Sequence, residues 1–407
     1  MSRRPRVLAI NTAYPPGRGA TGELLAELAV GLRALEWDVE VVAGPVAGEP
    51  AHRTVDGVEV FRTAGAALDA ASRPPVVVRA ARLGLAMPRL VRLALERARQ
   101  RPDVVLTMTD PPLGFAAGPW LARVAGAPVV HWAQDVYPEV AGALGVFPPD
   151  GGLARALRRL ATRALRRHDA VVAVGRCMKE TLVARGLDPS RVHVIPNWAL
   201  EGIEPVDPDA NAFRAEHVPP GAFAVAYSGN MGLAHPLGPI LDAAAELATT
   251  DPDVVWLLIG DGARRVWVER EVKGRRLGNV RVLPFQPRDR LAESLSAGDL
   301  HVVTMAPELE GLVVPSKAYG VLRAGRPILF AGPEGSEVAR MIGEDGTGEV
   351  VALDGAALAA AVRRWRDDPA RRAAARATAL ARAASGRADA IAAFDAMFRQ
   401  LLRASSA

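Results

Sequence analysis

The sequence predicts an α/β protein of two Rossmann-like domains, each a parallel sheet with helices on both faces. The chain has 407 residues, of which 50% are hydrophobic, so it is too long for one core and apolar enough to fill two. Short apolar runs alternate with amphipathic helical patterns, which is typical of parallel strands joined by helices. The alternation stops at 198–220, a segment rich in proline and acidic residues, and then starts again. We therefore expect the linker between the domains at this segment.

The first half of the chain supplies the first domain, in which strand and helix follow each other. Its expected strands are 7–11, 39–43, 58–61, 104–108, 129–132, 170–174 and 193–195. Its expected helices are 23–36, 75–99, 115–125, 154–167 and 177–185. We assign residues 1–200 to this domain.

The second half repeats the pattern and supplies the second domain, residues 201–387. Its expected strands are 223–228, 254–259, 280–284, 300–304 and 328–330. One clear helix is expected at 237–249. A last helix, 388–402, carries one apolar stripe that must pack on another surface: Ile391, Phe394, Met397, Phe398 and Leu401. In folds of this class, ligands bind beyond the carboxyl ends of the strands. We expect the site in a cleft where the two domains face each other.

Composition excludes several classes of protein. The single cysteine, Cys177, rules out a disulfide framework and fits a reducing compartment. No signal peptide is visible, and no stretch approaches the roughly 20 apolar residues of a spanning helix. The net charge is only +5, and aromatic residues are not interleaved with basic ones, which argues against nucleic-acid binding. We expect a cytoplasmic protein.

A glycine-rich loop, residues 15–22, follows the first strand. Its glycines, Gly17 and Gly19 among them, allow a ligand to approach the backbone, and the helix that follows presents free N–H groups to anions. The spacing matches neither the dinucleotide fingerprint nor the P-loop. Such a turn also occurs merely to reverse the chain, so both interpretations stay open.

Three loops of the second half each follow a strand and together offer backbone N–H groups, a hydroxyl and cations. They are Gly229-Asn230-Met231-Gly232, Gly260-Asp261-Gly262 with Arg264, and Pro315-Ser316-Lys317. Such groups hold a nucleoside diphosphate and stabilise it as a leaving group. The residues expected to bind a nucleotide-sugar donor are Gly17, Gly19, Gly229, Asn230, Gly232, Gly260, Gly262, Arg264, Pro315, Ser316 and Lys317.

The ordered set of motifs resembles the family-4 glycosyltransferases of the GT-B fold, in the branch that builds bacterial surface polysaccharides. The matching pieces are Tyr14-Pro-Pro-Gly17, Asp135-Val-Tyr-Pro-Glu139, Val194-Ile-Pro-Asn197, Ser228-Gly-Asn-Met-Gly232, Gly260-Asp-Gly262, Asn279-Val, and Pro315-Ser-Lys through Gly325-Arg-Pro327. The resemblance implies transfer of a sugar from a nucleoside-diphosphate sugar to a hydroxyl acceptor with retention, in surface glycan or glycolipid synthesis. It also implies that the second domain binds the donor and that the last helix, 388–407, crosses back to the acceptor-side first domain.

One departure from the family concerns its acidic pair. Many relatives carry a Glu-x7-Glu motif, whose positions here are Leu312 and Gly320. The second glutamate usually holds the donor ribose, so that contact is lost or made otherwise. Glu308 and Glu310 lie close by, and we take Glu310 as the candidate for the first acid, which touches the donor sugar. The alternative is an exposed loop with no such role.

A second departure lies beside the Asp-x-x-Pro loop, where relatives often have a histidine. Here Gln134 directly precedes Asp135, and His131 lies inside the expected strand, where we interpret it as structural. We expect Asp135 to orient the acceptor hydroxyl. For Glu139, that role and an ordinary loop carboxylate both remain open.

Among the cations, Lys317 is the first candidate for direct contact with the diphosphate, the alternative being a surface lysine. Arg264 resembles the basic residue that follows the family's Gly-Asp-Gly turn, and Lys273 is a weaker alternative. Asn197 is expected to anchor the crossover between domains through backbone hydrogen bonds.

The expected mechanism is front-face attack, in which leaving-group stabilisation and positioning matter more than a strong base. No Asp-x-Asp motif is found near a strand end, so we expect neither a metal ion nor another cofactor. Two other functions fit the same architecture, a nucleotide-sugar epimerase and a non-catalytic partner protein. A nicotinamide dehydrogenase is disfavoured because its glycine fingerprint is absent.

Two basic amphipathic stretches raise the prospect of peripheral contact with the inner face of the plasma membrane, where a lipid-linked acceptor lies. One is 78–92, and the other contains Arg155, Arg158, Arg159, Arg163, Arg166 and Arg167. Basic amphipathic helices adsorb to anionic leaflets. The alternative is a core-facing helix with a solvated basic side.

Overall fold

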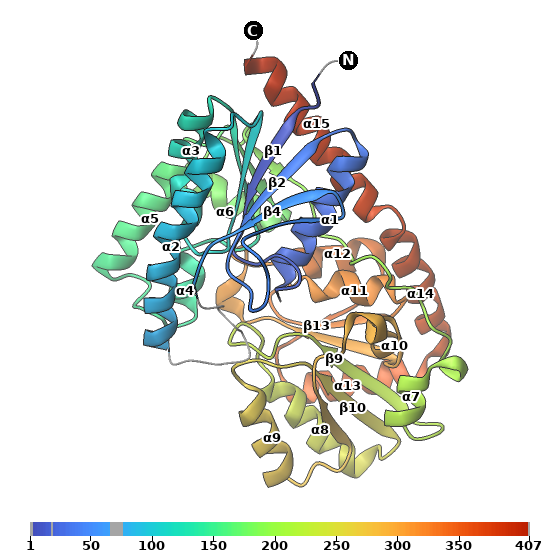
Figure 1. Ribbon diagram of the computed structural model, residues 1–407. Coiled ribbons are helices and arrows are strands. Elements are labelled where there is room, and N and C mark those ends of the chain that lie inside the picture. Colours follow the sequence, from blue (N-terminus) through green and yellow to red (C-terminus); the bar gives the residue numbers. More distant parts are fainter. Residues whose placement is uncertain (1–2, 18, 66–75, 406–407) are drawn as a thin grey trace. The chain divides into compact units, whose positions relative to one another are not determined.

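A computed structural model describes residues 3–17, 19–65 and 76–405, except for the side chains of 76–85 and 405 (Figure 1). The chain forms two compact units. The first contains 1–197, 311–314 and 387–407, and the second contains 198–310 and 315–386.

The first unit is built on an eight-stranded sheet of order β3-β4-β2-β1-β5-β6-β7-β8, parallel except for β3 against β4. Its strands are β1 (Arg6–Ile10), β2 (Asp38–Ala43), β3 (His52–Val55), β4 (Val58–Arg62), β5 (Val104–Met108), β6 (Val129–Ala133), β7 (Ala170–Ala173) and β8 (Val192–Val194). Its helices are α1 (Ala20–Ala34), α2 (Val76–Ala98), the 3-10 turn η2 (Gly114–Ala117), α3 (Gly118–Ala125), α4 (Glu139–Ala143), α5 (Gly152–Leu165) and α6 (Arg176–Ala184). Strands β5 and β6 are buried along their whole length because helices and neighbouring strands cover them.

The last helix, α15 (Gly386–Ser405), belongs to the first unit from Arg387 onward, and Figure 1 shows it in red near α1 in blue. Its Phe394 ring lies 4.9 Å from the Trp132 ring of β6, and Phe398 lies 5.7 Å from Trp37. The Trp37 indole donates a hydrogen bond of 2.6 Å to Asp395. The apolar stripe expected from the sequence is therefore the packing face of this helix.

The second unit has a six-stranded parallel sheet of order β11-β10-β9-β12-β13-β14. Its strands are β9 (Phe223–Ser228), β10 (Val254–Ile259), β11 (Val280–Leu283), β12 (Leu300–Thr304), β13 (Ile328–Ala331) and β14 (Gly348–Val351). Its helices are α7 (Ala212–His217), α8 (Gly238–Thr250), α9 (Arg265–Gly274), α10 (Leu291–Ser296), α11 (Lys317–Arg323), α12 (Glu337–Asp345), α13 (Gly355–Asp367) and α14 (Pro369–Ala383), with the 3-10 turns η3 (Pro208–Ala210), η4 (Arg288–Arg290) and η5 (Pro307–Leu309).

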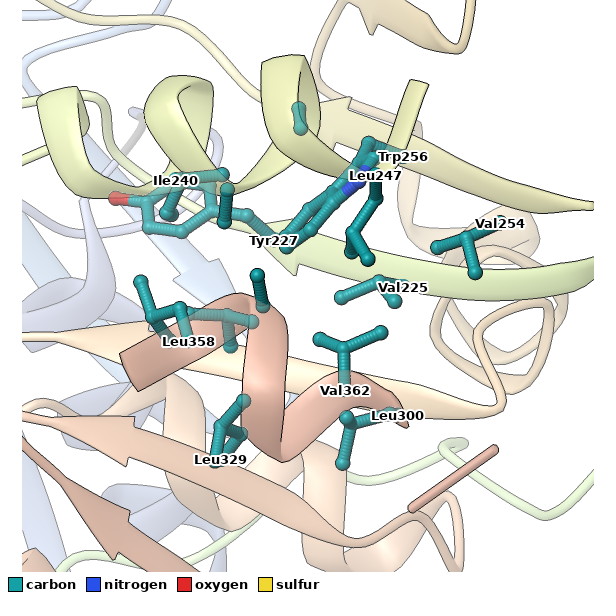
Figure 2. Packing of buried hydrophobic residues seen from close by; sticks show 14 of the residues in the cluster. Val225, Tyr227, Ile240, Leu247, Val254, Trp256, Leu300, Leu329, Leu358 and Val362 are labelled. Carbon is teal, nitrogen blue, oxygen red and sulfur yellow. The ribbon is translucent and has the colours of Figure 1, made fainter. Parts of the chain in front are cut away.

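The core of the second unit lies between its sheet and the pair α8 and α13. Figure 2 shows Tyr227 of β9 and Trp256 of β10 packed with Ile240 of α8 and with Leu358 and Val362 of α13, all fully buried. Burying a large apolar side chain contributes roughly 1.5–3 kcal/mol. This core fixes the positions at which β9, β10 and β12 end, where the loops of interest begin.

The structure differs from the sequence prediction most clearly at 311–314. We assigned this segment to the second domain, but it belongs to the first unit. The Val136 amide donates to the Leu312 carbonyl at 2.9 Å, and Asp135 forms an antiparallel bridge with Val313. Long-range backbone pairing of this kind leaves no local pattern in a sequence. We refer to Gly311–Val314 as the strap.

Candidate functional site

The loops that follow β9 and β10 are packed backbone against backbone. Gly229, Gly260 and Gly262 have φ angles of 138°, 147° and 149°, which favour glycine. A Cβ atom on Gly260 would lie 1.9 Å from the Gly229 carbonyl oxygen, and one on Gly262 would lie 2.5 Å from Oδ1 of Asn230. The Met231 amide donates to the Asp261 carbonyl at 2.7 Å. These glycines therefore hold the two loops together as one rigid surface.

Lys317 reaches this surface from the start of α11. Its Nζ donates to the Tyr227 hydroxyl at 2.7 Å and lies 4.0 Å from the centre of the Tyr227 ring. The Tyr227 hydroxyl in turn donates to the Asn230 carbonyl at 2.7 Å. A Cβ on Gly229 would lie 3.2 Å from Cε of Lys317, so only a small residue leaves the lysine its place.

The Lys317 amine has no acidic partner in the part of the chain that the structure describes. Burial lowers its pKa to about 7, and no carboxylate among the described residues forms an ion pair with it. An amine that is desolvated in this way gains more from an anionic ligand than a solvated surface lysine does. The site therefore suits an anion.

Arg264 is the second cation at the glycine loops. Its backbone amide donates to the Met231 carbonyl at 2.9 Å, which fixes the residue against the β9 loop. Its Nε is buried without a hydrogen-bond partner among the described residues, whereas neighbouring Arg265 donates to the Gly260 carbonyl and to Glu269, both at 2.8 Å. The guanidinium carbon lies 5.7 Å from the centre of the Trp267 ring, and its contact with a donor stays a prediction. Lys273 is exposed at the other end of α9, which disfavours it.

The remaining residues expected around the donor lie on the same loops with weaker evidence for a ligand role. Gly232 lies against the Asn230 amide, where a Cβ would come within 2.9 Å of Nδ2. Ser316 precedes α11 but makes no capping hydrogen bond with its side chain, so its hydroxyl is not used by the helix. Pro315 is buried beside it. Their contact with a donor stays a prediction.

The two positions of the missing acidic pair are structural here. Leu312 lies in the strap and uses its carbonyl to accept from Val136. A Cβ on Gly320 would meet methyl groups of Leu295 at 3.4 Å and Ile203 at 3.7 Å, an apolar setting for any carboxylate. Neither position supplies a polar side chain to a ligand.

The two glutamates that precede Leu312, Glu308 and Glu310, are both exposed. Glu308 lies in η5, and Glu310 follows it directly. The Glu310 carboxylate lies against Gly335, where a Cβ would come within 1.9 Å of Oε1. The proposed contact of Glu310 with the donor sugar stays a prediction.

His235 was not identified from the sequence. It lies on the β9 loop, and its Nδ1 is 2.7 Å from the Thr304 carbonyl at the end of β12. Burial, and then the charge of Lys317, lower the pKa of His235 to about 3. A histidine three residues after a glycine turn gives no signal of its own, because only the fold brings it beside the lysine.

In the first unit, Asp135 follows β6, and Asp110 follows the neighbouring strand β5. The Thr109 hydroxyl accepts from the amides of Gln134 at 2.9 Å and Asp135 at 3.3 Å, which ties the two strand ends together. Burial, and then the negative charge of Asp110, raise the pKa of Asp135 to about 6. A carboxylate with a raised pKa at a strand end is a candidate site residue. The sequence analysis identified Asp135 but missed Asp110.

Other polar residues of this loop are structural. Gln134 and Asn197 exchange amide hydrogen bonds of 3.0 and 2.8 Å in the interior. This side-chain pair gives Asn197 a structural role in the first unit, and its anchoring of the crossover through backbone bonds stays a prediction. Glu139 forms ion pairs with Arg158 at 3.0 Å and Arg185 at 3.1 Å, which favours its structural interpretation.

His131 is also structural, as expected. It is buried in β6, with Nδ1 3.1 Å from the Thr107 hydroxyl and its ring 4.6 Å from Phe115.

The first glycine-rich loop is closely packed in the first unit. The Gly17 amide donates to the Tyr14 carbonyl at 3.0 Å, and a Cβ on Gly19 would lie 2.9 Å from Cβ of Ala13. These contacts explain both glycines by packing. Their contact with a donor stays a prediction.

Further features of the described residues bear on metals and membranes. No three histidine, cysteine or acidic side chains among them gather as metal ligands. Within the same residues, no helix combines the length and apolar character needed to cross a bilayer.

Comparisons with known proteins agree with this architecture. Residues 19–198 match the family described as "Glycosyl transferase 4-like domain". The chain is 32% identical over 253 residues to "Probable glycosyltransferase WbjE" of Pseudomonas aeruginosa, a match that covers 62% of each protein. It is 27% identical over 338 residues to "Putative colanic acid biosynthesis glycosyl transferase WcaI" of Escherichia coli, covering 79% of this chain and 81% of that one. The solved structure of HepE from Anabaena in complex with UDP superposes with a TM-score of 0.70 at 17% identity, over 97% of this chain and 99% of that one.

Proposed function

Because the chain belongs to the family-4 glycosyltransferases of the GT-B fold, we propose that it moves a sugar from a nucleoside-diphosphate sugar to a hydroxyl acceptor, with retention of anomeric configuration. One observation carries the proposal. Lys317 and Arg264 flank a rigid glycine surface at the ends of β9 and β10, and neither has an acidic partner among the described residues. The UDP in the HepE structure supports a nucleoside diphosphate as the anion.

The chemistry proposed for these residues is stabilisation of the leaving group. As the bond between the anomeric carbon and the diphosphate breaks, its electron pair moves onto the phosphate oxygen, where the Lys317 ammonium and the Arg264 guanidinium lie. The acceptor hydroxyl forms the new bond on the same face and gives its proton to the leaving phosphate oxygen. Preorganised cations and N–H groups act well in such a step because they need no reorganisation as charge develops.

We assign Asp135 to positioning the acceptor hydroxyl, through an accepted hydrogen bond. This role needs the ionised carboxylate, which is present above the raised pKa of about 6. Since no nucleophilic carboxylate and no metal are required for front-face attack, we expect turnover in the presence of a chelator. Recovery of a chelated, inactive enzyme by manganese would contradict this.

We assign the product to surface glycan or glycolipid synthesis on the cytoplasmic side of the membrane, because WcaI carries a colanic acid biosynthesis name. The sequence pointed to two basic stretches for membrane contact. In 78–92, the side chains of 78–85 lie outside the described residues.

Helix α5 supports membrane contact. Leu153 is 61% exposed and Leu160 is 53% exposed, and both lie on one stripe with exposed Ala156 and Arg163. The helix contains no acidic residue. Each basic residue near an anionic leaflet contributes about 1 kcal/mol, and the leucines add apolar burial. We expect this face to adsorb to a membrane that contains anionic lipid. A lipid-linked acceptor would be confined to the same membrane.

Sedimentation with vesicles tests the membrane assignment. The chain should sediment with phosphatidylglycerol vesicles and remain in solution with phosphatidylcholine vesicles. The double variant Leu153→Ser, Leu160→Ser should lose this binding, whereas Val266→Ser, at an exposed apolar residue of the second unit, should keep it. Equal recovery of both variants with anionic vesicles would contradict the assignment.

A donor screen tests the enzymatic proposal. Nucleoside diphosphates and their sugars should raise the melting temperature, because a ligand that binds only the folded state stabilises it by mass action. Turnover of the stabilising donor should require an acceptor. Conversion of the donor without an acceptor would identify an epimerase, and binding without turnover across many acceptors would identify a non-catalytic partner protein.

A further inference from the structure

The proposed donor site lacks the acidic side chains with which its relatives are expected to hold donor hydroxyls. Leu312 and Gly320 occupy the positions of the acidic pair, and their surroundings are backbone and methyl groups. A donor sugar and its ribose nevertheless carry hydroxyls that lose water when they are bound. A buried hydroxyl without a partner costs roughly 1–3 kcal/mol. Another hydrogen-bond acceptor is therefore needed near Lys317.

The structure assigns this task to His235: we propose that its Nε2 accepts a hydrogen bond from a hydroxyl of the bound donor. The proposal rests on the donor site proposed above and names a residue of that site that the motifs do not contain.

His235 is held firmly. Its Nδ1 lies 2.7 Å from the Thr304 carbonyl, and the preceding residue, Ala234, accepts from the Ala306 amide at 3.1 Å. Both bonds tie the β9 loop to the chain that leaves β12 and leads to Lys317. The ring is therefore fixed between the two loops that border the proposed donor.

The hydrogen-bond partner of Nδ1 also determines the tautomer. A carbonyl oxygen only accepts, so Nδ1 must carry the proton, and in the neutral ring Nε2 then has a free lone pair. Among the described residues, no group donates to Nε2. Burial and the charge of Lys317 keep the ring neutral, since they lower its pKa to about 3.

This lone pair distinguishes among the parts of the donor. Phosphate oxygens of an ionised diphosphate only accept hydrogen bonds, so a neutral Nε2 gains nothing from them. Hydroxyl groups of the sugar and of the ribose donate, and they match Nε2. Lys317 and His235 thus divide the donor between them, the ammonium binding the diphosphate and the imidazole binding a hydroxyl.

Calorimetric titration of His235 variants tests the assignment. His235→Phe removes the hydrogen-bond acceptor and keeps a planar ring. His235→Gln restores an acceptor on a side chain without a ring. His217→Phe, at the end of α7 in the same unit, is the matched control. The probes are inorganic pyrophosphate, UDP, ADP, GDP and dTDP, and the glucose conjugate of whichever nucleotide the wild type binds.

We expect His235→Phe to weaken binding of the nucleotide sugar about three- to tenfold, as for loss of one neutral hydrogen bond, and His235→Gln to recover part of it. Pyrophosphate, which has no sugar hydroxyl, should bind the wild type and His235→Phe equally. A loss limited to the nucleotide sugar places the hydroxyl on the sugar, and a loss shared by the free nucleotide places it on the ribose.

Two results would overturn the assignment while leaving the donor site intact. One is unchanged nucleotide-sugar affinity in His235→Phe, and the other is an equal loss for pyrophosphate, which would make His235 a phosphate ligand. If the wild type binds none of the probes, the donor site itself is wrong, and the role of His235 falls with it.

Discussion

Replacing Lys317 with methionine removes the ammonium group and keeps most of the side-chain volume. In the structure, this amine donates to Tyr227 and has no acidic partner, so the change breaks no ion pair of the described residues. A hydrogen bond from a charged group contributes about 1.5–3 kcal/mol, which corresponds to about 10- to 150-fold in the dissociation constant of a nucleoside diphosphate. The loss in turnover should be larger, about 10²- to 10³-fold, because negative charge increases on the diphosphate as it leaves.

The pH dependence gives a second signature of the same residue. The pKa of Lys317 is lowered to about 7, so near that pH about half the free protein carries the ammonium. A diphosphate selects the protonated form, so its affinity should fall as pH rises above 7, by up to about tenfold per unit. In Lys317→Met this fall should disappear.

Stability should change in the opposite direction to binding. The folded pKa of Lys317 lies below the ordinary value of 10.5, so the unfolded chain binds more protons between the two values. This contribution destabilises the fold progressively as pH falls from 10.5 toward 7. The unliganded methionine variant should therefore melt no lower than the wild type at neutral pH, although it loses stabilisation by nucleotide.

Isothermal titration calorimetry with the nucleotide that the wild type binds is the assay, and Lys273→Met is the control. Lys273 is an exposed lysine of the same unit, so its removal changes the net charge equally without touching the glycine loops. Equal nucleotide affinity in Lys317→Met and Lys273→Met, with the same pH dependence, would refute the reasoning.

Three further predictions concern other titratable groups. Turnover with acceptor should fall below about pH 6 as Asp135 is protonated. Asp110→Asn removes the negative charge that raises the pKa of Asp135, so the fall in turnover should move to lower pH. An unchanged pH–rate profile in Asp110→Asn would contradict the electrostatic coupling of the two aspartates. Glu310→Gln should lower turnover about tenfold, as for a lost hydrogen bond to the donor sugar, whereas Glu308→Gln should not. Equal steady-state rates of the two variants would contradict a role for Glu310 in the site. Burial lowers the pKa of His168 to about 4, so as pH falls below 6.5 the unfolded chain binds a proton at this residue before the folded chain does. The midpoint of urea unfolding should therefore drop between pH 7 and 5, and this drop should be smaller in His168→Gln.

The sequence predicted the strands of both sheets well, because buried parallel strands are short apolar runs such as those of β5 and β10. It missed β3, whose side chains are mostly exposed, and β14, whose side chains are only half-buried, because neither strand has a continuous apolar run. The last helix was predicted from its stripe, and its packing partners Trp37 and Trp132 could come only from the fold.

The candidate site was also predicted in part from the sequence and in part only by the fold. Glycines at strand ends predicted the loops, and the structure explains their backbone by close approach. In the sequence, Tyr227 fits the pattern of an ordinary strand residue. No neighbouring residue indicates that its hydroxyl accepts a hydrogen bond from Lys317, 90 residues away. His235 and Asp110 likewise gain their surroundings from neighbouring strand ends, which a one-dimensional pattern does not contain.

A crystal structure of the chain with a bound nucleoside diphosphate tests the central claim most directly. The account predicts phosphate oxygens within hydrogen-bond distance of Nζ of Lys317, beside the glycines at the ends of β9 and β10. Well-defined nucleotide density anywhere else, with the lysine still held only by the tyrosine hydroxyl, would contradict it.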